Sequence, residues 1–280
     1  MNVQSYLEVT TEQELFDVAL RGFLLTSVLV LGGLLVFGSP YGSQTNYNGI
    51  FTISGRAAWI FMELVSPVVF IYSYFSSNLA FLLPSKIQPL ERSASTRSLV
   101  FVALWIAHYV NRAIIYPLRQ PSRKNMHIGI MLCAVVFNTV NAYLNGRWLA
   151  TAFSSHATEP FNSWDVRFVL GTALFVAGMA GNIHHDNLLM RLRSKKSKGN
   201  GSRYLIPYGS LFSFVSCPHF FCELAEWAGF ALASGSPAAW AFVLNILCNL
   251  APRAYFIHRW YIGTFAVYPK SRKAIIPFVF

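Results

Sequence analysis

The sequence predicts an all-α protein that crosses a membrane several times, on two observations. Apolar residues make up 54% of the 280-residue chain and charged residues only 12%, with a mean hydropathy of +0.44. Soluble domains typically carry about 25% charged residues, so this composition excludes them. Seven apolar stretches are also long enough to cross a hydrocarbon core of about 30 Å, which takes roughly 20 helical residues each. We therefore expect one membrane-embedded domain, residues 1–280, with seven transmembrane helices.

The first four expected spans cover residues 18–37, 57–76, 98–118 and 127–147. An acidic segment, residues 1–17, precedes the first span, whereas a cleavable signal peptide begins with basic residues, so we expect this segment to be retained. The second span contains Glu63 as its only acid or base over residues 57–75. The fourth contains Asn138, Asn141 and Asn145 at helical spacing, which we interpret as polar contacts between helices.

The last three expected spans cover residues 166–186, 209–234 and 237–257. Ala173, Ala177 and Gly181 recur every four residues in the first of them, a pattern that favours close packing against a neighbouring helix. Pro218 interrupts the second. Between these two spans, residues 194–203 are rich in Lys, Gly and Ser and form an expected loop.

Lysine and arginine are concentrated on one side of this topology, and so is the net charge of +11. They follow the first, third, fifth and seventh spans, and the positive-inside rule assigns these segments, including the loop 194–203, to the cytosol. We therefore expect a lumenal N-terminus and a cytosolic C-terminus. A basic face can attract anionic lipid, nucleic acid or a polyanionic cofactor, and nucleic acid is disfavoured because no basic domain lies outside the membrane.

Glu63 is the strongest candidate functional residue. A carboxyl group in an apolar span costs several kcal/mol unless it is paired, protonated or faces a polar cavity, and it therefore predicts a functional site. Packing against a polar neighbour is the alternative. At 1.5 Å per residue, Glu63 lies about 10 Å and Tyr109 about 12 Å below the cytosolic face, so the two side chains meet if their spans are adjacent.

Polar residues also line the cytosolic ends of the fifth and sixth spans. Asn182, Asp186 and Arg193 share one helix stripe, which suits a ligand with hydroxyl and phosphate groups. His219 and Glu223 follow Pro218. No arrangement of cysteine and histidine matches a zinc spacing, so we expect no metal site and four reduced cysteines. Glycine-rich nucleotide-binding loops are missing too, so helix side chains would hold any nucleotide.

Several motifs in order resemble the membrane-bound steroid 5α-reductase family, the 3-oxo-5α-steroid 4-dehydrogenases. The resemblance covers roughly residues 40 to 280 and rests on Pro40-Tyr-Gly42, Arg56 to Glu63, His108-Tyr-Val-Asn-Arg112, Tyr116-Pro-Leu-Arg119, Asn182-Ile-His-His-Asp186, Tyr204 to Gly209, Cys217 to Glu223, Glu226-Trp-Ala-Gly-Phe230, His258-Arg-Trp-Tyr261 and the tail from Tyr268.

The resemblance implies a multi-pass enzyme of the endoplasmic reticulum membrane that uses NADPH to reduce the C4–C5 double bond of 3-oxo-Δ4 steroids. It implies that Glu63 and Tyr109 bind the 3-keto oxygen, with Glu63 either protonated and donating or accepting from Tyr109. The implied partners are steroid and membrane lipid, without nucleic acid or an obligate protein partner. The cofactor residues it implies are Tyr41, Tyr116, Arg123, Asn182, Asp186, Arg193, Tyr204, His219, Glu223, Arg253, His258 and Tyr261.

Two departures from the family pattern weaken individual contacts. The family often has asparagine where this chain has Gln120 and His219. Three alternative functions stay open at this point: a related reductase of enoyl thioesters or polyprenals, a transporter or receptor, and a membrane methyltransferase. NADPH binding distinguishes the reductases from the last two classes.

Overall fold

The computed structural model describes residues 12–38, 51–76, 96–121, 123–155, 165–196 and 205–280. The long helices are α1 (Glu12–Phe37), α2 (Gly55–Phe75), α3 (Thr96–Tyr109), α5 (Ile128–Ser155), α6 (Val166–Lys196), α7 (Pro218–Ser234) and α8 (Pro237–Thr264). A π-helical segment η2 (Val110–Ile115) and the short α4 (Tyr116–Arg119) continue α3. A 3-10 turn, η3 (Ser210–Ser213), and two short antiparallel strands, β1 (Thr52–Ile53) and β2 (Met126–His127), complete the described elements.

Six helical segments are long and apolar enough to cross a membrane. They are α1, α2, the run Arg97–Arg119, α5, Val166–Ser194 of α6, and α8. Their outer faces are apolar: Leu29 of α1, Val68 of α2 and Val136 of α5 are each more than 60% exposed. Such faces suit contact with lipid, so the coarser expectation is confirmed: the described residues are mostly helical, with several helices that could span a membrane.

The expected sixth span, residues 209–234, is partly wrong. The helix in this region, α7, has 17 residues and begins at Pro218, whereas residues 209–217 contain a 3-10 turn and irregular chain. Proline lacks an N–H and is well suited to the first turn of a helix but not to its interior, which explains the boundary. Cys217 and Ser216 instead hydrogen-bond with the C-terminal segment through Lys273 and Ala274. Seven spans and the orientation of the termini stay predictions.

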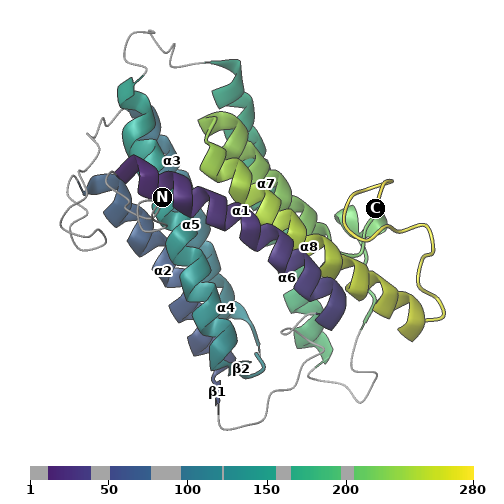
Figure 1. The fold of residues 1–280 in the computed structure, drawn as a ribbon. Helices are drawn as coiled ribbons and strands as arrows, with labels where there is room; N and C mark the ends of the chain where they lie inside the picture. Colours follow the sequence, from purple (N-terminus) through teal and green to yellow (C-terminus); the bar gives the residue numbers. More distant parts are fainter. Residues whose placement is uncertain (1–11, 39–50, 77–95, 122, 156–164, 197–204) are drawn as a thin grey trace.

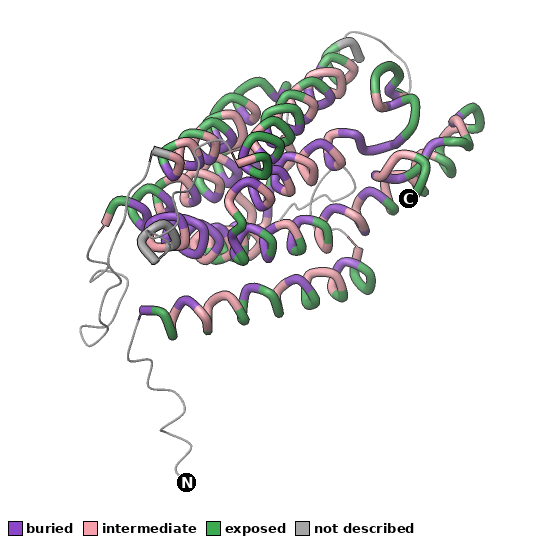
Figure 2. The backbone as a smooth tube through the Cα atoms, turned by 90° about the horizontal axis from the view of Figure 1, so that it is seen from above, coloured by how far each residue is buried: buried purple, intermediate pink, exposed green. Residues whose placement is uncertain are grey.

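The helices associate mainly in two pairs, α2 with α5 and α6 with α7, while α1 runs along α8 (Figure 1). Buried residues recur along the inner side of each helix, and exposed residues are frequent on the outer side (Figure 2). The centre of the bundle is aromatic: Phe70 stacks on Trp105 with ring centroids 4.4 Å apart, and Trp105 contacts Trp227 edge to face at 5.1 Å.

Glycine permits the closest helix contact, between α6 and α7. A Cβ atom added to Gly178 would lie 2.4 Å from the backbone N of Glu226, and one added to Gly229 would lie 2.4 Å from the N of Phe175. The expected packing face was therefore only partly right: Gly181 does contact α7, through Cys222, but Ala173 and Ala177 are exposed. The true face is shifted because Gly178 tolerates a closer backbone approach than alanine does.

A buried ion pair ties the start of α1 to α5. Arg147 donates to Glu12 through Nη2 at 2.9 Å and through Nε at 2.5 Å, and both residues are fully buried. Asn138 of α5 likewise donates to the carbonyl oxygen of Met62 in α2, as expected for a helix contact. These two polar links set how α1, α2 and α5 lie around the cavity described next.

Candidate active site

A cavity of about 880 Å³ lies between α1, α2, the α3–η2 helix, α5, α7 and α8. Its volume falls in the upper part of the range of about 300–1,000 Å³ that is usual for small-molecule sites. Apolar residues make up most of its wall, and both Glu63 and Tyr109 line it. The two side chains therefore border one cavity, as expected from their matched depth, and their role in it stays a prediction.

The π-helical segment η2 begins directly after Tyr109. π-helical turns are rare in proteins as a whole, but those that occur are often found at functional sites. His108, Tyr109 and Arg112 all line the cavity next to this segment.

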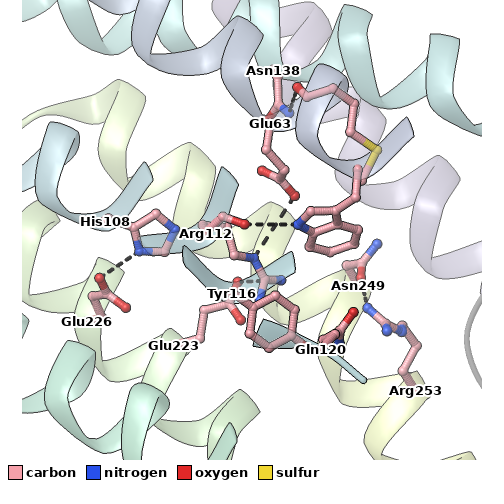
Figure 3. A network of polar contacts seen from close by, with 12 residues as sticks. Glu63, His108, Arg112, Tyr116, Gln120, Asn138, Glu223, Glu226, Asn249 and Arg253 are labelled. Carbon is pink, nitrogen blue, oxygen red and sulfur yellow. Dashed lines mark hydrogen bonds and ion pairs between the residues drawn. The ribbon is translucent and has the colours of Figure 1, made fainter. Parts of the chain in front are cut away.

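Arg112 lies at the centre of the polar part of the cavity. Its Nε is 4.0 Å from Glu63 Oε1, and its Nη2 is 3.7 Å from Glu223 Oε1, so one cation faces two carboxyl groups (Figure 3). Trp59 fixes the local backbone, since its Nε1 donates to the Arg112 carbonyl oxygen at 3.0 Å. Arg112 was not predicted as a site residue, although it is the one Asp, Glu, Lys or Arg in the expected span 98–118.

A second polar pair adjoins Tyr109. His108 Nδ1 lies 2.7 Å from Glu226 Oε1, and Glu226 is fully buried (Figure 3). The His108 ring also contacts the Tyr109 ring edge to face, with centroids 5.0 Å apart. Neither His108 nor Glu226 was assigned to the site from the sequence, although both lay in quoted motifs.

The predicted cofactor residues nearest Arg112 form one charged group. Tyr116, Arg123, Asp186 and Arg193 are close enough to interact electrostatically. Gln120 orients Tyr116 by donating to its hydroxyl oxygen at 2.8 Å. The Arg123 guanidinium lies 3.7 Å from the centre of the Trp59 ring, and its partial burial lowers its pKa to about 10, so it stays cationic at neutral pH.

The remaining predicted cofactor residues continue toward the C-terminal end. Asn182 donates to the His219 carbonyl oxygen at 2.9 Å, and Arg253 both lines the cavity and lies over the Phe220 ring. His258 Nδ1 is 2.6 Å from Ser216 Oγ, which is also 2.6 Å from Tyr268 Oη, and Tyr261 stacks on that tyrosine. Tyr41 and Tyr204 lie outside the described residues.

The residues present fit an anionic dinucleotide cofactor. Three buried polar atoms, Gln120 Oε1, Arg123 Nη1 and His219 Nδ1, have no hydrogen-bond partner within the described parts of the chain. Buried polar atoms normally have partners, so atoms of this kind indicate a missing ligand or solvent. One guanidinium group can hydrogen-bond two phosphate oxygens at once, and amide and imidazole groups can hydrogen-bond ribose or nicotinamide atoms. The described residues contain no group of three potential metal ligands.

Comparisons with known proteins identify the family of this chain. The family model described as 3-oxo-5-alpha-steroid 4-dehydrogenase matches residues 124–280. The 3-oxo-5-alpha-steroid 4-dehydrogenase 1 of Bos taurus is 35% identical over 246 residues, which cover 88% of this chain and 90% of the relative. The chain belongs to the 3-oxo-5-alpha-steroid 4-dehydrogenase family. It is thus a member of a family of steroid-metabolising oxidoreductases.

Other relatives of the 3-oxo-5-alpha-steroid 4-dehydrogenase family are similarly close. Steroid 5-alpha-reductase DET2 of Solanum lycopersicum is 38% identical over 257 residues, covering 87% of this chain and 89% of the relative. The uncharacterized protein C9.08c of Schizosaccharomyces pombe is 36% identical over 269 residues, covering 88% and 92%. A family of reductases supports the enzyme interpretation over the transporter, receptor and methyltransferase alternatives.

Proposed function

We propose that this protein uses NADPH to reduce the C4–C5 double bond of 3-oxo-Δ4 steroids. The observation that carries the proposal is that Glu63 and Tyr109 line one largely apolar cavity. A steroid needs apolar walls for its rings and a few hydrogen-bonding groups for its oxygen, and this cavity offers both. Membership of the reductase family supplies the reaction class.

The protein's part in the chemistry is to stabilise charge at the 3-keto oxygen. When bound, NADPH supplies the hydride that the reduction needs. Addition at C5 moves electron density through C4 to the 3-oxygen, which becomes enolate-like. Tyr109 donates a hydrogen bond to that oxygen, and Glu63 either donates to it when protonated or accepts from Tyr109 and orients it. Donors aimed at developing charge lower the barrier more than they strengthen substrate binding.

Arg112 adds a positive charge beside this oxygen-binding pair. It lies 4.0 Å from Glu63 and 3.7 Å from Glu223, so it holds both carboxyl groups in place and offsets their negative charge. An enolate that forms next to two uncompensated carboxylates would be repelled by them. We therefore assign Arg112 a positioning and electrostatic role.

The cofactor phosphates would bind on the side of Arg123 and Arg193. Arginine suits this task because its planar fork matches two phosphate oxygens. Tyr116, Asn182, Asp186, His219, Glu223, Arg253, His258 and Tyr261 would hold the remaining cofactor groups. We also propose residence in the endoplasmic reticulum membrane, where lipid-soluble steroids partition.

One incubation tests this proposal. Membranes containing the full-length protein are supplied with NADPH and a panel of 3-oxo-Δ4 steroids, enoyl thioesters and polyprenals, and products are identified by mass. We expect a gain of two hydrogens on the steroids alone. Reduction only of thioesters or polyprenals would replace the substrate assignment while leaving the reductase chemistry intact.

A further inference from the structure

His108 and Glu226 form a buried acid–base pair at the wall of the cavity, and the mechanism above does not use it. The imidazole Nδ1 is 2.7 Å from Glu226 Oε1, and the relative exposure of His108 and Glu226 is 6% and 0%. The second ring nitrogen points away from Glu226 in Figure 3, and His108 itself lines the cavity. A carboxylate on one imidazole nitrogen fixes the tautomer and leaves the other nitrogen available for proton transfer.

The reduction creates a need for such a group. A hydride and a proton are both added across the double bond, so each turnover consumes one proton. Tyr109 and Glu63 are assigned to the 3-oxygen, and neither accounts for the hydrogen added at C4. The cavity wall is mostly apolar, so bulk water is a poor source at the moment when the enolate forms.

We propose that His108, held by Glu226, is the general acid that protonates C4. This inference rests on the proposed steroid reduction. In this step the Nε2–H bond of the imidazolium breaks and a C4–H bond forms with the electron pair of the enolate. The 3-keto group is restored, and His108 becomes neutral while its Nδ1–H stays hydrogen-bonded to Glu226. A proton from water returns to His108 after the product has left.

The surroundings of His108 support a proton-carrying role. The charged groups that act on it come from three elements: Glu63 on α2, Arg112 on η2, and Glu223 and Glu226 on α7. Glu226 is the only one of them in hydrogen-bonding contact with His108 among the described residues. Its second oxygen, Oε2, is buried without a hydrogen-bond partner in the described parts of the chain, so His108 is the hydrogen-bond partner of this carboxyl group there. The Trp227 ring packs edge to face on the His108 ring, with centroids 4.7 Å apart, so an apolar side chain adjoins the pair.

Substitution of each member of the pair tests the proposal on the full-length protein in membranes. We compare His108→Gln and Glu226→Gln with the wild type, using His184→Gln on the exposed face of α6 as the matched control. General acids contribute about 10²–10⁴-fold, so His108→Gln should lower kcat at least about 100-fold while changing the steroid KM less than about threefold. The solvent deuterium isotope effect on kcat should increase, because proton delivery becomes the slow step.

Glu226→Gln keeps a hydrogen-bonding side chain but removes the charge that stabilises the imidazolium. The alkaline limb of its kcat profile should therefore move to lower pH, which a purely structural role would not produce. If His108→Gln does not accumulate in membranes, this pH profile decides the question. His184→Gln should behave as the wild type.

Two failures can be told apart. If the wild type reduces the steroid and both variants retain its kcat, isotope effect and pH profile, the role of His108 is wrong and the proposed function stands. If the wild type reduces none of the steroids, the proposed function fails and the inference fails with it.

Discussion

The Nε atom of Arg112 lies 4.0 Å from Oε1 of Glu63, and the same guanidinium lies 3.7 Å from Glu223. This contact joins the predicted steroid-binding carboxyl group to α7 and to the predicted cofactor residues. Glu63 therefore belongs to a charged network instead of being an isolated acid in an apolar helix.

Removal of the two groups assigned to the 3-keto oxygen should slow turnover. Tyr109→Phe and Glu63→Leu each remove a hydrogen-bonding group, and each should lower kcat for a 3-oxo-Δ4 steroid by about 10²–10³-fold, because one oxyanion donor typically contributes that much. The steroid KM should change less than kcat. The assay is product formation in membranes under saturating NADPH, and wild-type turnover in both variants would refute the catalytic assignment.

Substitution of Arg112 should affect both stability and activity. Arg112→Ala leaves Glu63 and Glu223 without their shared cation. Breaking a fully buried ion pair typically costs about 3–5 kcal/mol, and this partly buried one should cost less, with a measurable fall in the melting temperature. Arg112→Lys keeps the charge but loses the two-pronged geometry, and should recover part of the stability and less of the activity. Thermal melting in detergent and kcat are measured together. Equal loss in both variants would argue that shape, not charge, is the essential property.

Cofactor binding should depend on the arginines near Tyr116. Arg123→Ala and Arg193→Ala should each raise the NADPH KM about tenfold or more, because a charge-assisted hydrogen bond contributes about 1.5–3 kcal/mol. The steroid KM should stay nearly constant. Arg191→Ala, an exposed position on the same helix as Arg193, is the control and should leave both constants unchanged. An unchanged NADPH KM in the first two variants would place the phosphates elsewhere.

The packing of α6 on α7 should tolerate no side chain at Gly178. A Cβ atom there would lie 2.4 Å from the Glu226 backbone N, so Gly178→Ala must separate the helices. Overpacking of this kind costs about 1–3 kcal/mol, and the shift of Glu226 should also lower kcat. Gly22→Ala is the matched control, since nothing lies within 4 Å of its added Cβ. If the melting curves of Gly178→Ala and Gly22→Ala coincide, this packing argument is wrong.

Glu63, Tyr109 and the helical spans could be predicted from the sequence because their signals are local. A carboxyl group in an apolar run is costly wherever the run packs, and the hydrophobic length of a helix depends on its own residues. The functions of the predicted site residues stay predictions; among the described ones, Glu63, Tyr109, Glu223 and Arg253 line the cavity. Arg112 and His108 were missed because their partners, Glu223 and Glu226, are more than 100 residues away in the sequence.

The sequence by itself determined the membrane-embedded helical class, the family and the two residues that mark the cavity, since composition, apolar length and ordered motifs do not depend on how helices pack. Only the tertiary structure decided which polar groups are neighbours. In the structure, Gly178 lies on the face of α6 that contacts α7, whereas the expected Ala173 and Ala177 do not. Residues 209–217 lie outside α7. The tertiary structure also paired His108 with Glu226 and Arg112 with two carboxyl groups. The physical reason is that charge pairing and backbone approach depend on distances across helices, and those distances arise only when the bundle is assembled.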